Sequence, residues 1–289
     1  MSNKGSGFSR RNFLSGMGVF AAGAVAGSGL GLFPSPGSDS SHASQGEIPK
    51  WPWPYAAIDP ERARKKGHLG YYEGKCSQGA FSAIVSELQE NVGWPYTMLP
   101  VQMMAYGSGG VAGWCTLCGA VNGACAAITL VSKNYKELCD ELLKWYVSTP
   151  FPSDVSNSYA ENHEFLVEKY KTDKPLPKTV PGSPLCHVTV TRWCREHNFA
   201  SGSSERSERC ARISGDVAAF AAGLLNRDAE QTFSASLKYS DAVQSCRSCH
   251  AKGKDLQTGG WSRGKMECYD CHNLNTAKFI SPEEHFQGK

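Results

Sequence analysis

Two short motifs near the C-terminal end of this 289-residue chain have the spacing of covalent haem attachment sites. They read Cys246-Arg247-Ser248-Cys249-His250 and Cys268-Tyr269-Asp270-Cys271-His272. In such a motif, two thiols three positions apart can reach the two vinyl groups on one edge of a porphyrin, and the next histidine can ligate the iron. The sequence therefore predicts two haem c groups. Their thioether bonds come from Cys246, Cys249, Cys268 and Cys271, and their proximal iron ligands are His250 and His272.

Zinc is the strongest alternative for the same four thiols, because they also fit the pattern C-x2-C-x18-C-x2-C of a four-thiolate site. A structural zinc site needs no histidine after each cysteine pair, so it would leave His250 and His272 without a role. A separate disulfide within each motif is a further alternative and explains those histidines no better. Haem is therefore favoured over both.

Each haem iron needs a sixth ligand or keeps an open position. His285 lies thirteen residues after His272, in the same C-terminal segment, and is the first candidate for a distal ligand. A second histidine gives a low reduction potential, whereas a methionine raises it. The other candidates are His68, His163, His187, His197, Met98, Met103, Met104 and Met266.

The N-terminal residues resemble a twin-arginine export signal. Arg10 and Arg11 precede an uncharged run rich in Gly and Ala, Ser15 to Phe33. A membrane anchor is the alternative, but an anchor wants about 20 strongly apolar residues and this run is only moderately hydrophobic. We expect cleavage after Ala43, so that residues 1–43 are a signal peptide and the mature protein is periplasmic without a stable membrane span.

Composition and charge indicate a folded protein and give no sign of a nucleic-acid partner. The chain is 40% hydrophobic and 20% charged, as ordinary globular proteins are. Its formal net charge is +3, and the signal peptide contributes +2 of this, from Lys4, Arg10 and Arg11 against Asp39. About +1 remains on the mature protein, which gives no support for binding nucleic acid.

Helical signals dominate the segment between the signal peptide and the haem motifs. Asp59-Pro60-Glu61 offers an N-cap, a proline at the first helical position and an acidic first turn, and so predicts a helix to about Lys66. Apolar residues at helical spacing predict further helices. These span Cys76 to Leu88, the residues after Cys118 to about Val131, Tyr135 to Val147, and much of Ser203 to Asn226, while Cys186 to Cys194 is β-prone or a short helix.

Eight further cysteines precede the haem motifs, and four of them follow a distinctive order. Cys76 comes first, then Cys118-Gly119-Ala120-Val121-Asn122-Gly123, then Cys186, and then Cys210 before an alanine-rich helix. This order resembles the redox-associated family named for its C_GCAxxG_C_C pattern. Together with the two haem motifs, the chain from about Cys76 to His272 resembles the split-Soret cytochromes c. That resemblance implies a protein of sulfate-reducing bacteria, a dimer with two closely packed haems in each subunit, and a capacity to hold a [2Fe-2S] cluster.

The four cysteines of this order are the candidate ligands of a [2Fe-2S] cluster: Cys76, Cys118, Cys186 and Cys210. Iron–sulfur centres are held by four thiolates, which an all-helical domain can gather from helix ends and loops. Twin-arginine export points the same way, since that route serves proteins that acquire cofactors before crossing, whereas c-type haem is attached afterwards.

Other roles for these thiols stay open. Structural disulfides or buried free thiols are one alternative, and a thiol redox site at Cys115 and Cys118 is another. The chain also departs from the family pattern, so the choice of four ligands is not settled by sequence. The extra cysteines are Cys115, Cys125, Cys139 and Cys194.

We therefore expect a mainly α fold, with a helical cysteine domain over residues 44–237 and a small dihaem-binding segment over residues 238–289. The favoured function is one-electron transfer between periplasmic redox proteins by a homodimer, with no catalytic residues. The alternative is a haem enzyme that reduces a small molecule at an open axial site. No pair of carboxylates and no His/Arg cluster near either motif supports the enzyme.

Overall fold

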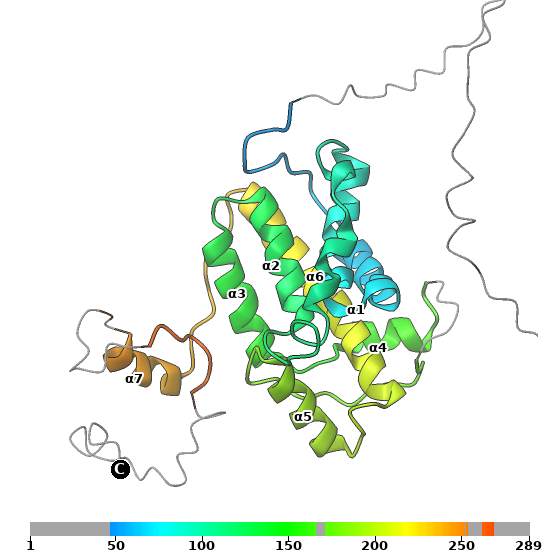
Figure 1. Ribbon diagram of the computed structural model, residues 1–289, viewed down its shortest axis with the longest axis vertical. Helices are drawn as coiled ribbons and strands as arrows, with labels where there is room; N and C mark the ends of the chain where they lie inside the picture. The colour runs from blue at the N-terminus through cyan, green and yellow to red at the C-terminus, as the bar shows by residue number, and fades with distance from the viewer. Residues whose placement is uncertain (1–46, 166–170, 252, 254–261, 269–289) are drawn as a thin grey trace, which may run out of the picture. The chain divides into compact units, whose positions relative to one another are not determined.

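The computed structural model describes residues 47–165, 171–251, 253 and 262–268. The predicted signal peptide lies outside these residues, as do Cys271, His272 and His285. Within the described residues the regular structure is helical, with two isolated β-bridges and no strand (Figure 1). The prediction of a mainly α fold is confirmed. The helices are α1 (Pro60–Asn91), η2 (Tyr96–Met98), η3 (Val101–Gly107), α2 (Gly119–Val131), α3 (Tyr135–Ser148), α4 (Asp154–Glu161), α5 (Cys186–His197), α6 (Ser204–Ala229) and α7 (Asp241–His250).

The two longest helices, α1 and α6, pack along each other, and α2 packs against both (Figure 1). Small residues make this contact close. A Cβ added at Gly67 would lie 2.8 Å from the carbonyl oxygen of Ser214, and one added at Gly215 would lie 2.5 Å from that of Arg64. Such distances leave no room for a side chain, so the two backbones touch at these glycines.

Helix α1 corrects the prediction of two separate helices. It begins as expected, with Asp59 Oδ1 accepting from the Glu61 N–H at 2.8 Å and Pro60 in the first position. It then continues past Lys66 to Asn91, with a kink at Gly74 and Lys75, whose backbone is not helical. Glycine weakens an isolated helix, but here the packing against α6 outweighs that preference.

The residues between Cys186 and Cys194 form helix α5 rather than a strand. Its start is tied to the loop before α2, because the Cys186 N–H donates to the Thr116 carbonyl at 2.6 Å and the Cys118 N–H donates to that of Pro184 at 2.8 Å. These bonds bring two cysteines that are far apart in sequence to one place. Helix α4 has no counterpart among the predicted elements.

Candidate redox centres

The four cysteines of the family pattern line one small cavity of about 20 Å³. Cys76 comes from α1, Cys118 from the residue before α2, Cys186 from α5 and Cys210 from α6. The structure thus brings together the four thiols that the sequence proposes as cluster ligands. None of the four extra cysteines is among the described residues that line this cavity.

Local backbone geometry places three of these thiols at helix N-termini. Cys118 is the N-cap of α2, and Cys186 is the first residue of α5. Cys76 directly follows the kink of α1 and so begins its second helical part. Unpaired N–H groups and the helix dipole favour negative charge at such positions, which suits a thiolate ligand.

Glycines of the Cys118 motif let α2 approach α1 at the cavity. A Cβ at Gly119 would lie 2.3 Å from Cys76 Sγ, and a Cβ at Gly123 would lie 2.1 Å from the carbonyl oxygen of Ser77. Both contacts are far inside van der Waals distance. The spacing of these two glycines, one turn apart, is therefore a packing requirement that holds two of the thiols together.

Burial and the neighbouring thiols raise the pKa of Cys76, Cys118 and Cys186, which favours the protonated form of these three side chains. Burial, and then the neighbouring Cys118 and Cys210, raise the pKa of Cys76 to about 12. Burial and then Cys118 raise the pKa of Cys186 as well. A bound metal centre reverses this preference, because it stabilises the thiolates and releases their protons.

Two buried hydrogen-bond donors also line the cavity. Arg209 is fully buried, and its Nε and Nη1 have no hydrogen-bond partner in the described part of the chain. The hydroxyl of Tyr146 is likewise buried, and it lies beside the thiol of Cys118. Buried donors require acceptors, and the sulfur atoms of an anionic centre in the cavity would supply them to Arg209.

The chemistry of the lining suits a thiolate-bound iron centre. Four thiols and the unpaired donors of Arg209 surround one cavity. Four thiolates are the donor set that iron–sulfur centres use. Among the described residues, no three His, Cys, Asp or Glu side chains already form a site for one metal ion.

The first haem motif lies on the last turns of α7, which carry Cys246, Cys249 and His250. Cys268 is the first thiol of the second motif. Its pKa is raised first by burial and then by the neighbouring thiol of Cys246, so the two side chains lie beside each other. The two motifs therefore begin next to each other. The rest of the second motif, Cys271 and His272, lies outside the described residues.

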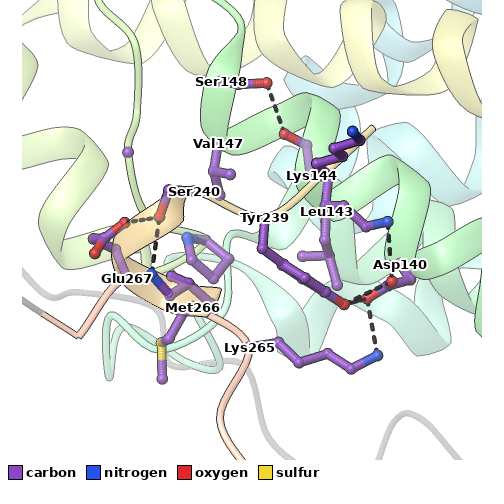
Figure 2. A pocket seen from close by; sticks show the side chains of 14 residues that line it. Asp140, Leu143, Lys144, Val147, Ser148, Tyr239, Ser240, Lys265, Met266 and Glu267 are labelled. Carbon is purple, nitrogen blue, oxygen red and sulfur yellow. Dashed lines mark hydrogen bonds and ion pairs between the residues drawn. The ribbon is translucent and has the colours of Figure 1, made fainter. Parts of the chain in front are cut away.

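The segment that leads into α7 is fastened to α3. The Glu141 carboxylate accepts from the backbone N–H groups of Ser236 at 3.0 Å and Leu237 at 3.1 Å. Figure 2 shows the next contact, where the Tyr239 hydroxyl and the Lys265 ammonium meet at Asp140. These bonds hold the haem segment on the helical domain.

A cavity of about 360 Å³ lies between α3 and this segment (Figure 2). Leu143 and Val147 of α3 line it, together with Val243 of α7 and Met266. Met266 is one of the predicted candidates for a sixth ligand, and its carbonyl oxygen lies 3.9 Å from Cys268 Sγ of the second motif.

The histidines considered as sixth ligands have other contacts where the structure describes them. His68 is buried, with Nε2 2.8 Å from Glu208 Oε1. His197 Nε2 lies 2.8 Å from Thr179 Oγ1, and His163 Nε2 lies 3.3 Å from Asp173 Oδ2. His187 is exposed. Of the candidate methionines, Met104 is buried in the core, and Met98 and Met103 are exposed.

Sequence reasoning missed Arg209 and Tyr146. A signal existed for Arg209, since it directly precedes the candidate ligand Cys210 on the face of α6 that carries buried residues. No sequence signal pointed to Tyr146, because it lies within an ordinary amphipathic helix, α3. Two of the four extra cysteines lie next to each other, since Cys139 Sγ is 3.9 Å from the carbonyl oxygen of Cys125.

Comparison with known proteins defines the class. Residues 75–224 match the family described as "Putative redox-active protein (C_GCAxxG_C_C)". The range includes all four cysteines of the cavity, so the site and the fold are those of a redox protein of this class.

Two known relatives identify the family within this class of redox proteins. Over 286 residues, the chain is 32% identical to "Split-Soret cytochrome c" of Desulfovibrio desulfuricans, covering 94% of this chain and 98% of the relative. A solved structure described as "A novel iron centre in the split-Soret cytochrome c from Desulfovibrio desulfuricans ATCC 27774" matches with a TM-score of 0.68 and 32% identity. It covers 79% of this chain and 95% of its own.

The chain belongs to the split-Soret cytochrome c family, a family of haem electron-transfer proteins. The resemblance predicted from the cysteine pattern is confirmed. No helix in the described part of the chain has both the length and the apolar character needed to cross a membrane.

Proposed function

We propose that this protein carries single electrons between redox proteins of the periplasm, using two haem c groups and a [2Fe-2S] cluster. The observation that carries the proposal is the cavity where Cys76, Cys118, Cys186 and Cys210 meet the unpaired buried donors of Arg209. The two haem motifs and the membership of a cytochrome c family support the haem part. When bound, these groups supply one-electron chemistry, and the protein sets their ligands, burial and spacing.

The chain's own residues perform three tasks in this function. The cavity thiols hold the cluster away from water, because helices α1, α2, α5 and α6 surround them. The contacts of Asp140 and Glu141 hold the haem segment against α3. The neighbouring positions of Cys246 and Cys268 keep the two haem attachment points close, which favours electron exchange between the haems.

Export by the twin-arginine route and a homodimer are part of the proposal. A folded cluster domain needs a route that accepts folded protein, and residues 1–43 have the form of the matching signal. A dimer is supported by the histidines, since His68, His163 and His197 all contact other side chains of their own subunit. His285, in the same C-terminal segment as the second haem motif, is the first candidate for a distal ligand, and a haem pair without other local ligands would favour a pocket shared between subunits.

The test is metal analysis of the full chain, matured through its own export route. We expect two haem irons, two non-haem irons and two acid-labile sulfides per chain, and a rhombic electron paramagnetic resonance signal after dithionite. Low-spin spectra at both haems would support a carrier, and a high-spin component would support the enzyme instead. Two irons per chain in total would refute the cluster and leave the dihaem cytochrome.

A matched pair of variants on α2 locates the cluster. Cys118→Ser removes a thiol of the cavity, whereas Cys125→Ser makes the same change on the same helix outside it. We expect C118S to lose the non-haem iron and keep both haems, and C125S to keep all the iron. Equal loss in both variants would contradict the assignment of the cavity.

A further inference from the structure

Arg209 is a fully buried guanidinium beside the four thiols, on α6 and one residue before Cys210. Part of this guanidinium has partners within the protein. Its Nη2 donates to Thr189 Oγ1 at 3.1 Å, and its central carbon lies 5.5 Å from the ring centroid of Trp193. Its Nε and Nη1 have no acceptor among the residues that the structure describes.

The unpaired donors are particular to this position. Arg212, less than one turn further along α6, is equally buried, yet its guanidinium is fully engaged. It donates to Glu208 Oε1 at 3.1 Å and to Asn157 Oδ1 at 2.6 Å. It also donates to the carbonyls of Lys174 at 2.9 Å and Thr172 at 2.8 Å. Burying a charge without a partner is costly, so Arg209 calls for an anionic partner that Arg212 already has.

The cavity itself offers that partner a place. Among the described residues that line it, Arg209 is the only one with a permanent charge, and no carboxylate is present. A centre held by the four thiols brings negative charge into the cavity, since the thiolate and not the thiol is the metal ligand. The positive charge of Arg209 is therefore matched when the cavity holds a thiolate-bound centre.

We propose that Arg209 is the counter-charge of the iron–sulfur centre, donates through Nε and Nη1 to its sulfur atoms, and raises its reduction potential. The proposal rests on the function proposed above. Two ferric ions, two sulfides and four thiolates sum to a charge of −2, which becomes −3 when the centre accepts one electron. A fixed positive charge in a low-dielectric site stabilises the more negative form more strongly. Arg209 is thus a positioning residue that makes the centre easier to reduce.

The test compares three variants of the full, cofactor-loaded chain. Arg209→Gln removes the charge and keeps a donor, whereas Arg209→Lys keeps the charge. Arg227→Gln is the control, because it removes an exposed charge from the same helix, 18 residues away and so about 27 Å along its axis. The midpoint potential of the cluster is measured by titration followed by electron paramagnetic resonance, with the haem potentials of the same samples as the internal reference.

We expect R209Q to favour the oxidised cluster by at least tenfold, a shift of 59 mV toward negative potential for one electron. The cluster potential of R209K should stay near that of the wild type, and the cluster potential of R227Q should equal it. In R209Q the haem potentials should shift less than the cluster potential. An R209Q variant that folds and carries haem but no non-haem iron, while R209K keeps the iron, also supports the counter-charge.

Two results would overturn the proposal. One is a cluster potential in R209Q equal to that of the wild type. The other is loss of the iron in R209K as well as R209Q, since lysine keeps the charge and the cause would then be the shape of the side chain. If the wild type itself holds no non-haem iron, the proposed cluster fails first and the counter-charge falls with it.

Discussion

Asp140 should fix the haem segment on the helical domain, and removing its charge should loosen α7 without unfolding the core. Its carboxylate accepts from the Tyr239 hydroxyl at 2.5 and 2.7 Å and from Lys265 Nζ at 2.9 Å. Burial alone would raise the pKa of Asp140, but the hydrogen bonds from Tyr239 and Lys265 outweigh burial and lower it. The ionised Asp140 therefore stabilises docking of the segment fully at pH values above the ordinary carboxyl pKa of 3.8. This stabilisation is lost as the pH falls through the lowered pKa of Asp140.

The size of the effect follows from these contacts. A hydrogen bond to a charged group contributes about 1.5–3 kcal/mol. The Lys265 pair adds at most about 1 kcal/mol, because Lys265 is half exposed. Asp140→Asn keeps one acceptor, so we expect docking of the segment to weaken by about 1–3 kcal/mol. Amide hydrogens of α7 would then exchange roughly 5 to 150 times faster if docking limits their protection.

Hydrogen exchange followed by mass spectrometry on the haem-loaded protein measures this directly. Peptides from α7 should exchange faster in D140N, whereas peptides from α1 and α6 should not change. Asp154→Asn is the matched control, because it removes an exposed ion pair with Lys178 at 2.8 Å on another part of the surface. Unchanged exchange in α7, or an equal increase across α1 and α6, would refute the docking role.

Two further predictions test the packing and the buried charges. Gly119→Ala places a Cβ 2.3 Å from Cys76 Sγ. We expect this variant to lower the free energy of unfolding by about 1–3 kcal/mol and to lose most of the non-haem iron. Gly202→Ala is the control: its added Cβ would have no atom within 4 Å, so it should change neither the iron content nor the melting temperature. Burial opposes ionisation of Glu208, but contact with His68 outweighs it and lowers the pKa of Glu208 below 4.5, so stability should fall as the pH drops below that value. Melting temperatures from pH 3 to 7 check this second prediction, which fails if Glu208→Gln shows the same acid-dependent loss as the wild type.

The candidate site was predictable where its chemistry is local. Haem attachment needs two thiols and a histidine within five residues, so each motif is complete in the sequence before any folding. The start of α1 is equally local, because the Asp59 cap and Pro60 act on the first turn alone. The proposed set of cluster ligands came from the order of the cysteines, and the structure places those four around one cavity.

Other features depend on contacts between distant segments. The end of α1 was predicted too early, because Gly67 is unfavourable in a lone helix and becomes necessary only where α6 packs on it. The sequence marks Arg209 only as the neighbour of Cys210 and does not show that its donors stay unpaired while those of Arg212 are satisfied. Only the fold gives Arg212 its acceptors and leaves Arg209 facing the thiols.

The sequence by itself determined the haem chemistry, the helical class and the family, because motif spacing and helical periodicity are properties of neighbouring residues. The tertiary structure decided which thiols meet and which charges remain unpaired. Cys76 and Cys210 are 134 positions apart, and they share a cavity only because glycines let α1, α2 and α6 touch. Burial then creates the need of Arg209 for an anion, since a charge that folding removes from water requires a partner.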